Sequence, residues 1–441
     1  MEYGLVLAAS FPMVLNSKLF VKKMFLMFSM ALGTLWMVVN FPMENFKASQ
    51  IWYWDCFSWV MIIITMWVVF LIVFITSSIF MTNLFVVASV SSLVFFMSSN
   101  WLWLFISFEL SLIPIYLVIT CFGEHPERMR AGLYLMMYTM FASVPLFITL
   151  IYKLKMEGTS SLMLDTIEVS YSEDSSILFM MAMMIAFMVK MPVFLSHSWL
   201  PKAHVESPLG GSVFLASILL KFGSYGVYRS FMIFPWLFSS TLMWVFYSVA
   251  LIGAVYGALM SLTSTDLKVI IAYASVSHMN LGMATLLCMK FLSLKSFLIS
   301  MISHSLCSGL LFLTASISMG VTNTRSVVLS KGVLSTFPVL VMVNFLTWSL
   351  NVSVPPSLSF IGEIYSVLSN YILFSFSLLL ILVYIFISSI YSITLYSVSS
   401  SSNEETLFKS SMPVCNPLFN SFFMIIPLVI LFFFSNILLF Y

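Results

Sequence analysis

The chain has 441 residues, of which 61% are hydrophobic and only 8% are charged, and its mean hydropathy is +1.08. Soluble domains are roughly 25% charged, so this composition indicates a membrane protein. The net charge of +2 comes from 18 basic and 16 acidic residues spread thinly along the chain, without the basic stripe that would suggest nucleic acid as a partner.

Apolar runs recur along the chain at lengths near the roughly 20 helical residues that cross a bilayer. Their residues do not alternate between apolar and polar, as those of a membrane β-barrel would. We therefore predict an all-α, polytopic transmembrane helical bundle in a single integral membrane domain. The fourteen expected spans, of which the first is short, are at about 2–16, 20–42, 56–77, 79–98, 101–121, 131–152, 177–200, 209–231, 238–262, 267–289, 294–318, 333–368, 373–397 and 418–440.

Two of these spans contain interior prolines, which remove a backbone donor and clash with the preceding turn. Pro192 and Pro201 lie in the seventh span, and Pro355 and Pro356 lie in the twelfth. We expect both helices to be broken, which a bilayer tolerates where the freed backbone groups are buried in protein or line a watery cavity. The two breaks are five spans apart and suggest an inverted repeat of about 79–232 and 238–398.

Motifs for redox or nucleotide chemistry are missing from the sequence. The five cysteines are never closer than 19 positions, which excludes the short spacings of metal, disulfide-redox and haem-attachment motifs. No glycine-rich nucleotide loop is present. We expect neither a metal nor a cofactor in this chain.

Three ionisable side chains lie at mid-depth in apolar spans: Glu109, Lys190 and Lys221. A charge at that depth costs at least ~2.5 kcal/mol, so intramembrane charges usually serve a function. A carboxylate close to a buried ammonium favours its charged form, so we expect Glu109 to hold a proton on Lys190. The alternatives are a protonated Glu109 that only packs helices together and a Lys190 that caps carbonyls at the break.

A second group comprises His278, His304 and Glu363. The two histidines lie near the centres of neighbouring spans among hydroxyl side chains, and Glu363 follows the second break as Lys190 precedes the first. Histidine accepts and donates protons near neutral pH. We interpret the group as a proton relay, against the alternative of buried histidines that are simply hydrogen-bonded.

Gly253 and Gly257 form a G-x-x-x-G pattern. In membrane helices this spacing lets two backbones approach closely. We therefore expect a tight helix contact there.

Several segments resemble the subunit-4 family of mitochondrial NADH:ubiquinone oxidoreductase, respiratory complex I. The likeness covers about residues 100–370. It is carried by FELSLIP at 108–114, PERMRAG at 126–132, KMP at 190–192, WLPKAHVESP at 199–208, LLKFG at 219–223 and on to Arg229, TDLK at 265–268, AYASVSHM at 272–279 and GE at 362–363.

This resemblance implies an antiporter-like, multi-pass subunit of the mitochondrial inner membrane that carries a proton channel. It places the family's proton-transfer residues on Glu109, Lys190, Lys221, His278, His304 and Glu363. The implied partners are phospholipids and other membrane-arm subunits, including neighbouring antiporter-like subunits. NADH, flavin, iron–sulfur clusters and ubiquinone are expected in other subunits.

The sequence departs from the family pattern at a few positions, including Asn280, where glycine is common, and none of them removes an ionisable group. Two other functions stay open at this point. The chain could be a purely structural membrane subunit whose buried charges hold the fold, or a free-standing cation/proton antiporter.

Overall fold

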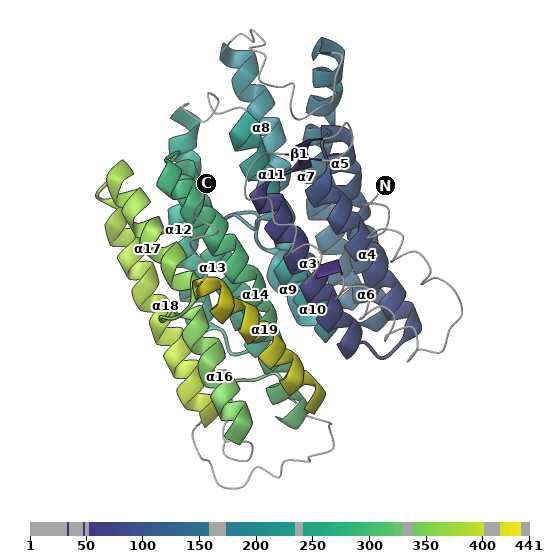
Figure 1. Cartoon of the computed structure of the whole chain (residues 1–441), viewed down its shortest axis with the longest axis vertical. Coiled ribbons are helices and arrows are strands. Elements are labelled where there is room, and N and C mark those ends of the chain that lie inside the picture. The colour runs from purple at the N-terminus through teal and green to yellow at the C-terminus, as the bar shows by residue number, and fades with distance from the viewer. Residues whose placement is uncertain are drawn as a thin grey trace. The chain divides into compact units, whose positions relative to one another are not determined.

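A computed structural model describes residues 33–34, 47–48, 53–157, 173–233, 241–322, 324–328, 338–400 and 415–433. Helices make up almost all of this part (Figure 1). The elements are β1 (Lys47–Ala48), β2 (Tyr53–Trp54), α3 (Cys56–Ile75), α4 (Ile79–Met97), α5 (Trp101–Leu110), α6 (Leu112–Phe122), α7 (Arg128–Glu157), α8 (Glu173–Lys190), α9 (Trp199–Glu206), α10 (Leu209–Phe214), the π-helix η3 (Leu215–Leu219), α11 (Leu220–Ile233), α12 (Thr241–Thr263), α13 (Leu267–Leu287), α14 (Phe291–Thr322), α16 (Pro338–Asn351), α17 (Leu358–Leu373), α18 (Ser377–Ser400) and α19 (Cys415–Phe433).

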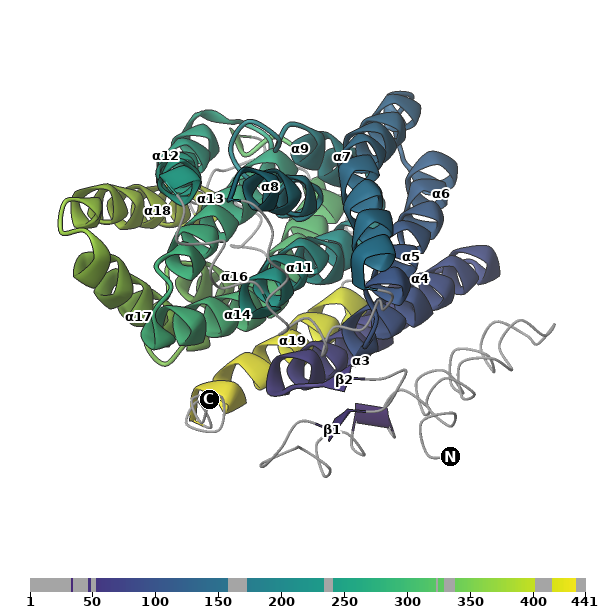
Figure 2. The same ribbon diagram turned by 90° about the horizontal axis from the view of Figure 1, so that it is seen from above.

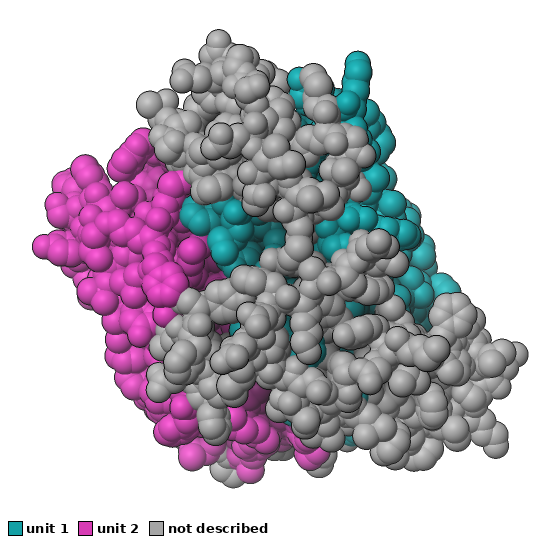
Figure 3. Space-filling view, turned by 45° about the horizontal axis from the view of Figure 1, so that its top comes forward, with its two compact units in different colours: residues 1–191, 206–240 teal, residues 192–205, 241–441 magenta. Residues whose placement is uncertain are grey.

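The chain divides into two compact units, coloured separately in Figure 3. Unit 1 consists of residues 1–191 and 206–240, and unit 2 consists of residues 192–205 and 241–441. Within unit 1, α3 packs on α4, and α8 packs on both α7 and α11. Within unit 2, α13 packs on α12 and α14, and α14 also packs on α17 (Figure 2).

Nine helices of the described residues are long and apolar enough to cross a membrane. Their many serines and threonines do not disrupt them, because the hydroxyls donate to backbone carbonyls three or four residues earlier, as Ser89 does to Val86 at 2.8 Å. The all-α, multi-pass fold is thus confirmed. As far as the described residues reach, the expected spans from 56 onward coincide with single helices or with consecutive helical segments. The two spans at 2–16 and 20–42 lie outside the described residues, apart from 33–34.

Both predicted breaks are present. The last helical bond of α8 runs from Met191 N–H to the Phe187 carbonyl at 2.9 Å, and residues 191–198 form turns before α9 begins. Pro201 does not contribute to the break, because it lies in the first turn of α9, where a backbone donor has no helical partner. The second break separates α16 from α17 at residues 352–357, which include Pro355 and Pro356.

Candidate functional site

Lys190 is the last residue of α8, and its side chain is buried in unit 1. Its ammonium donates to the carbonyl of Phe108 in α5 at 2.8 Å. It also lies 3.1 Å from the ring centroid of Phe108 and 5.2 Å from that of Phe222 in α11. Ring faces carry partial negative charge, so two rings and a carbonyl oxygen stabilise a cation at this position.

Glu109 follows Phe108 and interacts electrostatically with Lys190. Its Oε1 atom is buried and has no hydrogen-bond partner among the described residues. The two predicted partners are therefore neighbours, but within the described part of the chain the ammonium is bonded to the Phe108 carbonyl and not to the carboxylate. A proton on Lys190 and an acceptor beside it are the minimum components of a proton-transfer step.

Lys221 lies just after the π-helix η3, and its side chain is completely buried. Its ammonium donates to the carbonyl of Ala216, inside the π turn, at 2.8 Å. Phe222, the next residue, provides one of the two rings that lie near the Lys190 ammonium. Glu109, Lys190 and Lys221 all lie in unit 1. Sequence reasoning missed the π turn, although such turns are frequent at functional sites.

Glycines let α11 approach the end of α8 closely. A Cβ atom on Gly223 would lie 2.6 Å from the Phe187 carbonyl oxygen and 2.7 Å from the Met191 nitrogen. On Gly226 it would lie 2.1 Å from the Phe187 ring. The helix with Lys221 thus packs directly against the turn that ends in Lys190.

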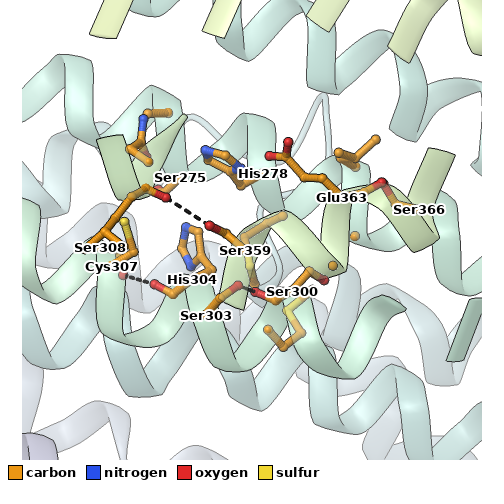
Figure 4. A pocket seen from close by; sticks show the side chains of 18 of the residues that line it. Ser275, His278, Ser300, Ser303, His304, Cys307, Ser308, Ser359, Glu363 and Ser366 are labelled. Atoms are coloured by element: carbon orange, nitrogen blue, oxygen red, sulfur yellow. Dashed lines mark hydrogen bonds between the residues drawn. The ribbon is translucent and has the colours of Figure 1, made fainter. Parts of the chain in front are cut away.

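A second group of polar side chains surrounds a cavity of about 40 Å³ in unit 2 (Figure 4). His278 from α13, His304 from α14 and Glu363 from α17 all line it, together with several serines. The two imidazole rings are 5.9 Å apart between centroids. One water requires roughly 10–15 Å³ of such volume, so the cavity is large enough for about three or four waters. The three residues that the sequence analysis identified in this half of the chain, His278, His304 and Glu363, therefore line one cavity large enough for water.

The second break supplies a partner for Glu363. Ser353 has a φ of 62°, an uncommon backbone conformation for a residue other than glycine. Its hydroxyl donates a hydrogen bond to the Glu363 carboxylate. The turn therefore places a hydroxyl donor on the acid that faces the cavity.

Tyr384 and Tyr391 in α18 were missed by the sequence reasoning. The Tyr384 hydroxyl lies 2.8 Å from Nδ1 of His278, and the Tyr391 hydroxyl accepts a hydrogen bond from Asn351 at 3.0 Å. Both tyrosines are buried and interact electrostatically with Glu363. Their spacing of seven residues puts both on one face of a helix, which is the signal that could have revealed them.

Arg229 in α11 is a further buried charge without a predicted role. It forms an ion pair with Asp55, at the start of α3, and its Nε donates to the Tyr225 hydroxyl at 2.8 Å. The Tyr225 hydroxyl in turn donates to the Phe96 carbonyl at 3.0 Å. Because Arg229 is paired with Asp55 and bonded to Tyr225, we interpret it as a structural link between α3, α4 and α11.

Known proteins are similar in sequence to this chain over most of its length. The family described as "NADH:quinone oxidoreductase/Mrp antiporter, TM" matches residues 98–392. NADH-ubiquinone oxidoreductase chain 4 of Rhipicephalus sanguineus is 34% identical over 421 residues, which are 92% of this chain and 94% of the relative. The same chain of Ceratitis capitata is 36% identical over 372 residues, 82% of each protein.

The chain belongs to the family of NADH-ubiquinone oxidoreductase chain 4. Solved structures match the fold of this protein over nearly its whole length. A chain of respiratory complex I from Thermus thermophilus with bound NADH has a TM-score of 0.89 at 21% identity, covering 99% of this chain and 97% of that one. A chain of the Mrp complex from Dietzia sp. DQ12-45-1b has a TM-score of 0.87 at 14% identity, covering 99% and 94%. At such identities the likeness concerns the fold alone.

Proposed function

We propose that this antiporter-like membrane subunit of respiratory complex I translocates protons across the mitochondrial inner membrane. The observation that carries the proposal is the cavity lined by His278, His304 and Glu363, because three titratable groups around a water-sized space within membrane helices form a path for protons. NADH oxidation and ubiquinone reduction take place in other subunits, which hold the redox cofactors.

In the proposed cycle, the charge of Glu109 stabilises a proton on Lys190. A charge change in a neighbouring antiporter-like subunit weakens this interaction, and Lys190 releases its proton to Lys221 or to water. The group of His278, His304 and Glu363 then passes a proton on, and the two groups act in series along an inverted repeat. Moving one charge against 100 mV costs about 2.3 kcal/mol, within the several kcal/mol that separate a buried charge pair from its broken state.

Glu109→Gln in the assembled complex tests this function. The amide keeps the shape of the side chain but removes its charge, so we expect fewer protons pumped per NADH oxidised while the complex assembles normally. NADH oxidation and proton uptake are measured side by side on the same vesicles. Glu127→Gln is the matched control, because that carboxylate is exposed in the segment between α6 and α7.

A proton-to-NADH ratio that stays at the wild-type value in Glu109→Gln would contradict the proposal. Lys221→Met separates it from the purely structural alternative, in which buried charges only hold the fold. If the buried charges only held the fold, an assembled Lys221→Met complex would keep the wild-type ratio of protons pumped to NADH oxidised. We expect its ratio to fall.

A further inference from the structure

Asn280 is a completely buried amide of α13 that reaches the first break. Its Nδ2 donates to the carbonyl of Pro192 at 3.1 Å, and its Oδ1 accepts from the N–H of Phe194 at 3.2 Å. Both backbone groups lie in the turn segment 191–198, where no helix supplies their partners. A single side chain therefore satisfies one donor and one acceptor that the break sets free.

The orientation of this amide is fixed by its surroundings. Nδ2 also donates to the Val276 carbonyl at 2.8 Å, so both amide hydrogens face carbonyl oxygens. A flipped amide would place its own oxygen against those two carbonyls and its NH2 group against the Phe194 N–H. Only the observed orientation of the Asn280 amide forms hydrogen bonds with the Pro192 and Val276 carbonyls and with the Phe194 N–H.

Gly253 in α12 makes room for this arrangement. A Cβ atom there would lie 2.8 Å from Asn280 Oδ1 and 2.8 Å from the Cβ of Phe194. Gly257, one turn later, approaches the Ser277 backbone, with its added Cβ 3.0 Å from the Ser277 nitrogen. The close contact predicted from the G-x-x-x-G pattern is confirmed, and at Gly253 it covers the bonds between Asn280 and the break.

The segment 191–198, which Asn280 holds, contains a polar side chain of its own, His197. The Phe194 ring stacks on His197, with centroids 5.9 Å apart, and meets Tyr256 of α12 edge-on at 5.0 Å. The Nδ1 atom of His197 is buried without a hydrogen-bond partner among the described residues. Fixing the backbone at Phe194 therefore also fixes where His197 lies.

We propose that Asn280 is a positioning residue that clamps the break after Lys190 to α13, the helix that carries His278. Lys190 is two residues before Pro192 in the chain, so the segment that Asn280 holds is the one that directly follows this lysine. This inference rests on the proposed proton translocation. It gives a physical role to a position at which the sequence departs from the family pattern.

The test uses two variants in the assembled complex. Asn280→Leu replaces the amide with an apolar side chain of similar size, and Asn280→Gly removes the amide without adding bulk. Hydrogen–deuterium exchange of segment 191–198 reports the clamp directly, and we expect it to be at least about tenfold faster in both variants. The ratio of protons pumped to NADH oxidised should fall, as in Glu109→Gln.

Asn370→Leu is the matched control. Asn370 is an equally buried amide of unit 2, but it bonds to the Ser366 carbonyl and the Tyr247 hydroxyl, away from the break. We expect normal exchange at 191–198 and a normal pumping ratio. A merely structural loss lowers the amount of complex, and with it proton uptake and NADH oxidation together, so it leaves their ratio unchanged.

If hydrogen–deuterium exchange at 191–198 were unchanged in the assembled Asn280 variants, Asn280 would not hold this segment on α13. Faster exchange with an unchanged pumping ratio would overturn the positioning role. If Asn280→Leu fails to assemble, Asn280→Gly decides by the same two measurements. A normal ratio in Glu109→Gln would instead refute proton translocation by this chain, whereas the exchange result would still test the clamp.

Discussion

The hydroxyl of Tyr384 is the hydrogen-bond partner that the structure gives to Nδ1 of His278. A hydrogen bond at one nitrogen holds the orientation of the imidazole ring, and because a tyrosine hydroxyl can donate or accept, either tautomer of His278 keeps this bond. The other ring nitrogen, Nε2, is buried and has no partner among the described residues. Tyr384 therefore holds the imidazole ring of His278 in its orientation at the cavity.

Replacing Tyr384 with Phe removes this hydrogen bond and keeps the ring. We expect the ratio of protons pumped to NADH oxidised to fall, and the complex to lose about 1–3 kcal/mol of stability from the unpaired imidazole nitrogen. Proton uptake and thermal unfolding of the purified complex measure the two effects. Tyr396→Phe serves as the control, because Tyr396 lies on the same helix and packs against Phe345, away from the cavity. Identical ratios in the two variants would show that Tyr384 has no part in proton transfer.

At the scale of elements, α11 approaches α8 closely in unit 1, because glycines of α11 face the last turns of α8. The added Cβ of Gly226→Ala would overlap the Phe187 ring at 2.1 Å, so α8 has to shift, and Lys190 shifts with it. Overpacking of this kind costs about 1–3 kcal/mol, more than the roughly 1 kcal/mol that alanine gains over glycine in a helix. We expect a lower unfolding temperature and less assembled complex.

Gly282→Ala provides the contrast. Its Cβ would meet the terminal methyl of Met301 at 2.6 Å, and this flexible group can move aside. We expect an unfolding temperature close to that of the wild type or slightly above it. If Gly226→Ala were equally harmless, the approach of α11 to α8 would not be as tight as the structure has it.

Helix positions were predictable because long apolar runs leave the backbone no other way to satisfy its hydrogen bonds in a bilayer. Prolines likewise located both breaks, although Pro201 proved to start a helix and not to interrupt one. The π turn at Leu215–Leu219 left no such mark, because its residues are ordinary apolar ones. Its extra residue is a matter of backbone hydrogen bonding, which periodicity alone does not encode.

For the whole molecule, the source of driving energy separates the proposed function from that of a free-standing antiporter. In the described part of the chain, no group of three or more His, Cys, Asp or Glu side chains could hold a metal ion. We expect the isolated chain in liposomes to show no sodium- or potassium-driven proton exchange above empty vesicles, measured with a pH-sensitive dye. Exchange that Lys221→Met abolishes would favour the antiporter.

The candidate site was predictable in part. Charge in an apolar helix is expensive, so Glu109, Lys190 and Lys221 stood out without any structure. Tyr384, Tyr391 and Asn280 did not, because tyrosine and asparagine are unremarkable in sequence and become informative only through the partners that tertiary packing gives them. The serial use of all six ionisable residues stays a prediction.

The π turn before Lys221 also affects how this chain is aligned with others. A π turn holds one residue more than an α turn, so every residue after it is rotated by about 100° relative to an uninterrupted helix. Two sequences that differ by one residue between Leu209 and Lys221 can thus present a lysine in the same direction if only one of them has the turn. An alignment gap at this point is then a record of backbone geometry and not of a lost functional group.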